Sequence, residues 1–134
     1  ILSTLRTEFD YVVVDMGVSF GDCAISAMET ADSILLVVNE DIASLHDAKR
    51  SIKVMEALNQ QDKLQIVVNK DGISTITVKN VANLLEATPM LVIPFDLKSA
   101  MLAVNRGIPM LSCAPNSKAS KVIRGFAQAM IRRM

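Results

Sequence analysis

Four short runs of apolar, mostly β-branched residues recur along the chain and predict β-strands. They comprise residues 11–14, 34–38, 64–68 and 90–93. Most of the runs are continuous instead of alternating with polar residues, which is typical of strands that are buried on both faces of a sheet. The pattern therefore predicts a sheet with helices packed on both sides.

Segments of helical periodicity separate these runs. Two of them place apolar residues on a single helical face: Leu45, Ala48, Ile52, Met55 and Leu58 in the first, and Val78, Val81, Ala82 and Leu85 in the second. After the fourth strand, Asp96 is expected to cap a helix that ends at Gly107, and Ser117 to cap the last helix. Strands that alternate with helices indicate right-handed βαβ connections. We therefore expect one domain over residues 1–134, an α/β three-layer sandwich with a mainly parallel sheet.

The composition narrows the range of functions. The 134 residues are 51% hydrophobic, which is enough for a sizeable core, and fourteen Lys and Arg balance fourteen Asp and Glu. Zero net charge argues against a nucleic-acid partner, because binding to phosphates needs an excess of basic residues. Two cysteines in unrelated contexts favour reduced thiols in a cytoplasmic protein over a secreted disulfide framework. No apolar run approaches the length needed to cross a bilayer.

Polar or conformationally special residues follow each predicted strand. The four strand ends read Asp15-Met16-Gly17, Asn39-Glu40-Asp41, Asn69-Lys70-Asp71 and Pro94-Phe95-Asp96. In parallel α/β sheets, ligands bind beyond the carboxyl ends of the strands. The polar residues at any one strand end are explained if that strand simply reaches solvent there. Polar residues at all four strand ends together indicate a binding site at this edge of the sheet.

Asp15 is the strongest single candidate for a residue that binds a metal ion. An acidic residue directly after three valines of a buried strand is placed like the Asp that holds the water shell of Mg²⁺ in nucleotide hydrolases. Gly17 permits the following loop to turn or to approach a phosphate closely. The same pattern also fits a phospho-accepting receiver domain or a plain strand-to-helix turn.

Asn69 is the second candidate, for contact with a base. A carboxamide carries both a donor and an acceptor and can pair with the edge of a purine. A purely structural role, in which Asn69 caps a turn over residues 69–72, explains an Asn at this position at least as well as contact with a base does. Pro94 and Phe95 are suited to form an apolar wall against a base, whereas Asp96 is better explained as a helix cap than as a ligand contact.

A phosphate loop is missing from the sequence. Such a loop needs Gly-x-x-x-x-Gly-Lys-Ser/Thr between a strand and a helix, and none of the five glycines stands in that context. The chain also lacks an initiating methionine, and its first residues, Ile1–Thr7, are typical of the last part of a helix. We therefore expect the C-terminal part of a longer protein, unable by itself to act as a complete phosphate-loop nucleotidase.

Taken in order, these segments resemble the MinD/ParA ATPases, phosphate-loop proteins of the SIMIBI class. Residues 9–15 look like their second acidic strand, residues 31–38 like the next strand, residues 67–70 like the strand whose Asn reads adenine, and residues 93–96 like the segment against the base. Residues 100–109 and 118–133 are most similar to the CpaE/TadZ branch. Members of that branch help to position and assemble Flp-type (tight adherence) pili.

The resemblance implies roles for the strand-end residues. It assigns Asp15 and Gly17 to the Mg²⁺ and switch region, with Asp15 holding the metal through water. It assigns nucleotide binding to Asn69, Lys70, Pro94, Phe95 and Asp96. It further implies ATP and Mg²⁺ in the intact protein and no cofactor in this chain alone. The partners it implies are a second copy and pilus assembly proteins, in a cytoplasmic protein recruited to the inner membrane or the cell pole.

One loop departs from the family pattern, and one strand is missing. Residues 16–22 lack the proline-containing switch of active ParA and MinD members, which argues against hydrolysis more than against the fold. In the family, the phosphate-loop strand lies between the strands equivalent to residues 10–15 and 33–38. Without it, the resemblance predicts that these two strands pair directly or that another segment fills the gap.

Further interpretations stay open. The chain could be a non-catalytic scaffold with a degenerate nucleotide site that acts through protein contacts. A receiver-like domain would need an acidic pair before residue 8 and a Lys-Pro where this chain has Ile93-Pro94. The last helix carries basic residues beside an apolar stripe: Lys118, Lys121, Arg124, Arg132 and Arg133. That pattern fits a peripheral membrane contact, but we favour a helix packed on the sheet with its basic side in solvent.

Overall fold

The computed structural model describes residues 1–17 and 20–133, so Val18 and Ser19 of the atypical switch loop lie outside it. Its helices are α1 (Leu2–Glu8), α2 (Asp22–Thr30), α3 (Ile42–Ala57), the 3₁₀ helix η1 (Gln61–Lys63), α4 (Val78–Leu85), α5 (Leu97–Arg106), α6 (Met110–Cys113) and α7 (Lys118–Arg133). Its strands are β1 (Ile34–Asn39), β2 (Leu64–Asp71) and β3 (Leu91–Pro94).

The three strands form one parallel sheet in the order β1-β2-β3. β1 and β2 pair residue by residue, from Ile34 opposite Leu64 to Asn39 opposite Asn69. α3 connects β1 to β2 and α4 connects β2 to β3, so each parallel pair is joined through a helix. The second, third and fourth predicted strands are therefore confirmed, together with the α/β class and the parallel sheet.

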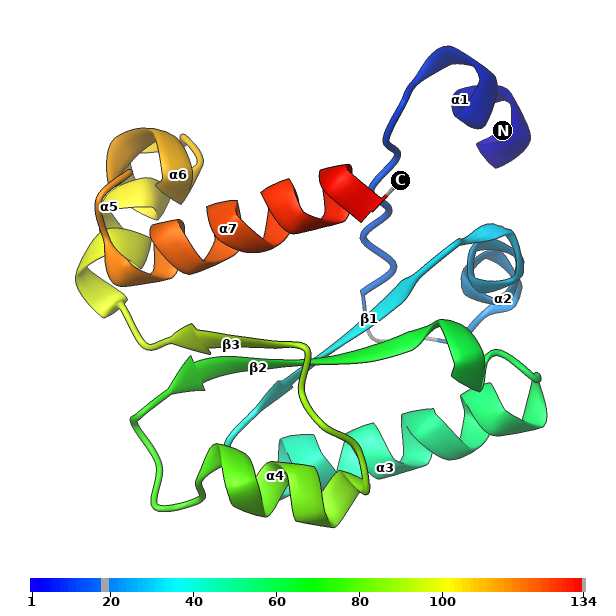
Figure 1. Cartoon of the computed structure of the whole chain (residues 1–134), viewed down its shortest axis with the longest axis horizontal. Coiled ribbons are helices and arrows are strands. Elements are labelled where there is room, and N and C mark those ends of the chain that lie inside the picture. Colours follow the sequence, from blue (N-terminus) through cyan, green and yellow to red (C-terminus); the bar gives the residue numbers. More distant parts are fainter. Residues whose placement is uncertain (18–19, 134) are drawn as a thin grey trace.

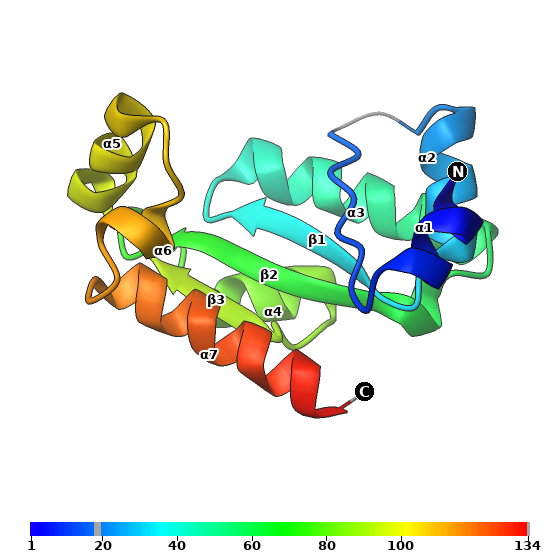
Figure 2. The ribbon, with the colours of Figure 1, turned by 90° about the horizontal axis from the view of Figure 1, so that it is seen from above.

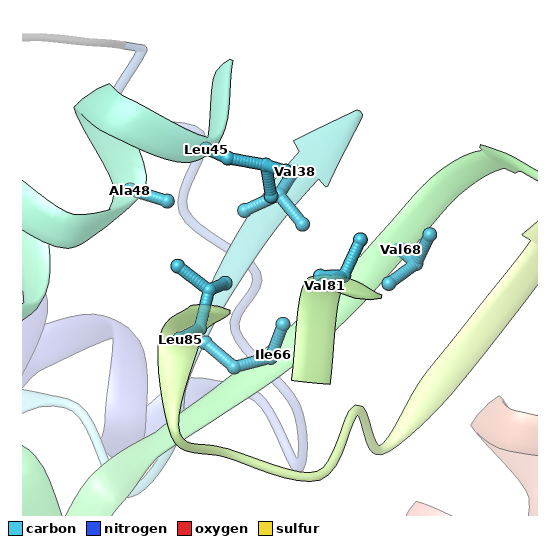
Figure 3. Close-up of a cluster of buried hydrophobic side chains, with 7 residues drawn as sticks. All are labelled: Val38, Leu45, Ala48, Ile66, Val68, Val81 and Leu85. Atoms are coloured by element: carbon cyan, nitrogen blue, oxygen red, sulfur yellow. The ribbon is translucent and has the colours of Figure 1, made fainter. Parts of the chain in front are cut away.

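Helices lie on both sides of this sheet. α3 and α4 lie on one side and α7 on the other (Figure 1). Between the sheet and the helices α3 and α4, seven buried side chains form the main core: Val38, Leu45, Ala48, Ile66, Val68, Val81 and Leu85 (Figure 3). The strands supply one face of this core, and the apolar stripes predicted for the two helices supply the other.

A second apolar cluster joins α2 to the body of the protein. Met28 of α2, Ile34 of β1 and Met55 of α3 are buried against one another. α1 has no buried residue and is linked to the rest by an exposed ion pair of Arg6 with Asp32, at 3.0 Å. Exposed pairs of this kind contribute at most about 1 kcal/mol. The start of β1 is thus anchored through α2, while α1 is attached only at the surface.

The helix caps predicted from the sequence are present. The Asp96 carboxylate accepts a hydrogen bond from the Ser99 N–H at 3.1 Å, which starts α5. Gly107 ends the same helix in the left-handed conformation, at φ 62°. The Ser117 hydroxyl accepts a hydrogen bond from the Ser120 N–H at 3.1 Å, at the start of α7. These local signals explain where both helices begin and where α5 ends.

Residues 11–14 do not form the strand that their sequence predicts. Val13 is 96% exposed, and the side chains before and after it are also exposed. Within the described residues, this segment neither pairs with β1 nor is separated from it by an inserted strand. Both predicted ways of closing the gap are therefore wrong: the edge of β1 stays unpaired, and residues 11–14, without a hydrogen-bonded neighbour, do not form a strand.

One face of β1 is open as well. Ile34 and Val38 point into the cores, but Leu35 and Val37 alternate with them and are 42% and 57% exposed. Seen from above, α7 runs on the β3 side, and β1 is visible along its length, crossed by the coil before α2 (Figure 2). The prediction that all the strands are buried on both faces is thus wrong for β1.

Candidate functional site

The carboxyl ends of the three strands meet at one edge of the sheet. Asn39 of β1 lies opposite Asn69 of β2, and Asn69 in turn lies opposite Ile93 of β3. Asp71 is paired with Pro94. Three of the four strand ends singled out in the sequence are therefore neighbours, as expected for a parallel sheet.

A bulge shapes the end of β2. The register of β2 against β3 shifts between Asn69 and Asp71, so Lys70 is an extra residue on the β2 side. Lys70 adopts the left-handed conformation, at φ 61°, which is unfavourable for a residue with a side chain. Beyond it, the Phe95 N–H donates a hydrogen bond to the Asp71 carbonyl at 2.9 Å. The bulge brings residues 69–71 alongside the start of the segment that follows β3.

That segment presents an aromatic side chain and a helix cap. Pro94 is partly buried, and the Phe95 side chain is 41% exposed. The pKa of Asp96 is lowered because its carboxylate accepts hydrogen bonds from the backbone N–H and then the hydroxyl of Ser99, with a smaller contribution from Ser117. Asp96 therefore acts as the predicted cap, while Phe95 has surface available for a ligand.

Glu40 is a buried acid at this edge that the sequence analysis did not single out. The residue is 3% exposed, and its Oε2 atom accepts a hydrogen bond from the Gly72 N–H at 3.1 Å. Burial raises the pKa of Glu40, and the neighbouring Asp71 carboxyl adds to the rise, against the opposing effect of the Gly72 N–H. The sequence does contain a sign of this acid, because Glu40 closely follows a run of apolar, mostly β-branched residues. However, Asn39-Glu40-Asp41 is equally typical of a strand that ends at the surface.

Asp15 and Gly17 form a local turn of their own. The Asp15 carboxylate is exposed and accepts a hydrogen bond from the Gly17 N–H at 3.0 Å, with Gly17 at φ 63°. In the described part of the chain, no hydrogen bond or ion pair joins this turn to the Asn69 or Phe95 segments. The structure thus brings together the predicted base-side residues but does not join the predicted metal-side residues to them.

Neither a metal cluster nor a membrane-spanning helix is found in residues 1–17 and 20–133. No group of three or more His, Cys, Asp or Glu side chains is placed to hold a metal ion there. None of the helices in those residues has the length and apolar character needed to cross a membrane.

Comparisons with known proteins relate this geometry to one class of ATPase. The chain is 26% identical over 133 residues to an uncharacterized ATP-binding protein of Methanocaldococcus jannaschii, covering 98% of this chain and 50% of that protein. It is 27% identical over 136 residues to the septum site-determining protein MinD of Thermotoga maritima, covering 96% and 49%. The chain thus spans about half the length of these curated relatives. No protein-family model matches it.

Solved structures show the same arrangement of helices and strands. The ParA family ATPase from Chlorobium tepidum superposes with a TM-score of 0.89 at 23% identity, over 95% of this chain and 53% of that one. The MinC:MinD cell division complex of Aquifex aeolicus contains a chain that superposes with a TM-score of 0.80 at 25% identity, over 97% and 56%. The fold is therefore the parallel α/β fold of MinD/ParA ATPase structures. Together with the sequence relatives, this likeness supports a relation of the chain to the MinD/ParA-type ATPases.

Proposed function

We propose that this chain forms the base-binding side of an ATP-dependent switch of the MinD/ParA type. The observation that carries the proposal is the pairing of Asn69 with Ile93 of β3, directly before Pro94 and Phe95, at the carboxyl edge of the sheet. The name of one relative includes ATP binding, and that of a structural neighbour includes ParA family ATPase. These likenesses favour the proposal over the receiver-like alternative.

Each strand end takes a distinct part in this proposal. The Asn69 carboxamide supplies a donor and an acceptor to the edge of adenine, beside Lys70 on the bulge. Pro94 and Phe95 form the wall against the face of the base, where the exposed part of the Phe95 ring is available for stacking. Asp96 holds the start of α5 through its cap, which orients the Pro94–Asp96 segment.

The phosphate side of the site lies outside this chain in our proposal. The open face and free edge of β1 are where one more parallel strand with its helix would pack, and the relatives are about twice as long as this chain. We infer that sequence preceding Ile1 supplies this strand and the phosphate loop. Bound Mg²⁺ would neutralise charge on the phosphates, and Asp15 and Gly17 would face that part of the site.

The finer assignment concerns the biological setting. We propose that the whole protein belongs to the CpaE/TadZ branch, switches as a homodimer, and localises Flp pilus assembly proteins at the inner membrane or the cell pole. The support is the resemblance of residues 100–109 and 118–133 to that branch. A related structure is described as a complex of MinD with MinC, which supports protein partners as a general mode of action.

ATP affinity of the Asn69→Ala variant tests the proposed site. The measurement uses the whole protein that contains these residues, titrated with ATP and GTP by calorimetry. Removing the Asn69 carboxamide leaves polar groups on the edge of the base without hydrogen bonds, which costs roughly 1–3 kcal/mol. We therefore expect ATP binding to weaken about 5- to 150-fold. The preference of the protein for ATP over GTP should be lost as well. Asn83→Ala on the exposed side of α4 is the matched control. Unchanged ATP affinity in Asn69→Ala would remove the adenine role.

A non-catalytic scaffold is the second candidate. It is favoured by the atypical loop over residues 16–22 and by the exposed apolar side chains of β1, which suit protein contacts. The two candidates differ in ATP turnover. Turnover by the whole protein that disappears in Asp15→Ala would eliminate the scaffold, whereas binding without turnover would favour it.

A further inference from the structure

We propose that α5 is a membrane-contact helix, whose outer apolar face lies in the surface of an anionic lipid bilayer. The proposal deepens the proposed function, because it assigns a surface to the recruitment to the inner membrane. It does not depend on nucleotide binding. The contact lies on α5 and not on α7, the helix whose basic residues and apolar stripe suggest a membrane contact in the sequence.

The apolar face of α5 is turned away from the rest of the protein. Leu97, Met101 and Val104 follow the spacing of one helical face, and they are 56%, 50% and 75% exposed. The opposite face carries residues that are partly buried: Ser99, Leu102 and Ala103. An amphipathic helix on a globular protein normally buries its apolar face against the core. Within the described residues, the apolar face of α5 is therefore left uncovered.

This helix lies at one end of the molecule. It follows β3 beyond the carboxyl ends of the strands and packs beside α6 (Figures 1 and 2). Ile108, two residues after the end of α5, is also exposed. The exposed apolar side chains thus form a ridge on a single helix, and a ridge at the end of a molecule can meet a flat surface.

The charge on the C-terminal helices is positive. None of the residues after Asp96 is acidic, and seven of them are Lys or Arg. Lys98 and Arg106 are exposed on α5 itself, and Lys118 and Lys121 are exposed in the first turn of α7. A helix with an apolar face and with lysine or arginine beside it is the kind that binds the surface of anionic bilayers.

Two protein occupants fit this surface less well. If a second copy docked with its own α5, the Lys98 and Arg106 side chains of the two copies would come close, and no acidic residue after Asp96 could pair with them. A helix of another protein would cover only the few side chains of one ridge, whereas a stable protein interface buries roughly 1,200 Å² or more. A bilayer covers such a ridge without a matching groove, and its anionic headgroups attract the basic side chains.

Flotation with lipid vesicles tests the proposal on the 134-residue chain. One set of vesicles contains equal parts of phosphatidylglycerol and phosphatidylcholine, and the other contains phosphatidylcholine alone. The chain is expected to bind the anionic vesicles more tightly than the neutral ones. Added salt should weaken this binding, because it screens the attraction between the headgroups and the basic side chains.

Variants of α5 locate the contact. Val104→Glu removes an apolar contact and adds a negative charge, so it should weaken binding to the anionic vesicles about 10- to 100-fold. Lys98→Gln removes one positive charge and should weaken this binding about fivefold. Val13→Glu makes the same change as Val104→Glu at an exposed valine before α2, so it is the matched control and should bind like the wild-type chain.

Several results would overturn the proposal. Equal binding to both sets of vesicles, no binding to either, or unchanged binding by Val104→Glu would each do so. Loss of binding in Ile131→Glu on α7 or Val37→Glu on β1, but not in Val104→Glu, would place the contact on another exposed surface. If circular dichroism shows that Val104→Glu does not fold, the neutral Met101→Gln replaces it and should weaken binding several-fold. The assay contains no nucleotide, so its failure is distinguishable from a failure of the ATP titrations.

Discussion

Two neighbouring valines on β1 test whether one face of the sheet is open in solution. Val37 is 57% exposed and Val38 is 1% exposed, because successive side chains of a strand point to opposite faces. Replacing either with Ala removes the same two carbon atoms from the same strand. Differences in intrinsic strand preference therefore cancel between Val37→Ala and Val38→Ala, and the burial of each side chain decides the result.

The expected costs follow from burial. Two fully buried carbons are worth about 1.6 kcal/mol of transfer free energy at roughly 0.8 kcal/mol each. Val38→Ala also leaves a cavity in the main core, so we expect a loss of about 2–3 kcal/mol in the free energy of unfolding. Val37 is less than half buried and leaves no enclosed cavity, so we expect a loss of about 0.7 kcal/mol.

Urea unfolding of the 134-residue chain and its two variants measures this difference. A gap of more than about 1 kcal/mol between the variants is expected, with unchanged m-values. Equal losses for the two variants would refute the reasoning, because they would mean that Val37 is covered in solution. In the whole protein the proposed additional strand and helix cover this face, so there Val37→Ala should become nearly as costly as Val38→Ala.

Two further predictions concern helix caps. The Thr77 hydroxyl accepts a hydrogen bond from the Asn80 N–H in a capping box at the start of α4, so Thr77→Ala should lower the free energy of unfolding by about 1 kcal/mol, while the exposed Thr75→Ala should not. The pKa of Asp96 lies below the ordinary 3.8, so its contribution to stability is present above 3.8 and is lost as the pH falls through the lowered pKa. Asp96→Asn keeps a capping side chain that does not titrate. Its stability should therefore fall less steeply in acid than that of the wild-type chain, as measured by thermal melts from pH 5 downward.

Local signals predicted much of the fold because they act within one turn or one strand. Asp96, Gly107 and Ser117 act on hydrogen bonds a few residues away, so their positions in the sequence are enough to place helix ends. The stripe of α3 and the stripe of α4 both face the core as their periodicity indicates. Parallel pairing followed from the alternation of strands with helices, which leaves little choice of connection.

The candidate site was predicted only where strand pairing creates it. Asn69 lies opposite Ile93, next to Pro94, because parallel strands end at the same edge, and that much follows from topology. The Glu40–Gly72 hydrogen bond does not follow from it, because that contact depends on the bulge at Lys70 and on a side chain that reaches across from the end of β1. A short polar stretch after a strand contains the residues of such a contact but not their geometry.

The net charge of zero hides an uneven distribution that bears on the partners. None of the fourteen Asp and Glu lies after Asp96, whereas half of the fourteen Lys and Arg do. The region that forms α5, α6 and α7 is therefore basic, and the region before it is acidic by the same amount. Long-range attraction depends on the local charge within about 10 Å at moderate salt, not on the sum over the chain. The exclusion of anionic partners from net charge holds for residues 1–96 but has no force for the C-terminal helices.

Residues 11–14 have a high propensity for a strand but do not form one, which shows that this propensity depends on a neighbouring strand to pair with. Three consecutive valines with an adjacent tyrosine favour the extended backbone wherever a pleated surface is available to pack against. In this structure the segment has no hydrogen-bonded neighbour, and Val13 is left in solvent. On the other side of the gap, β1 has a free edge and an open apolar face. The same absence accounts for both defects, because an inserted strand would pair with the backbone of each segment, and the helix connected to that strand would cover Leu35 and Val37.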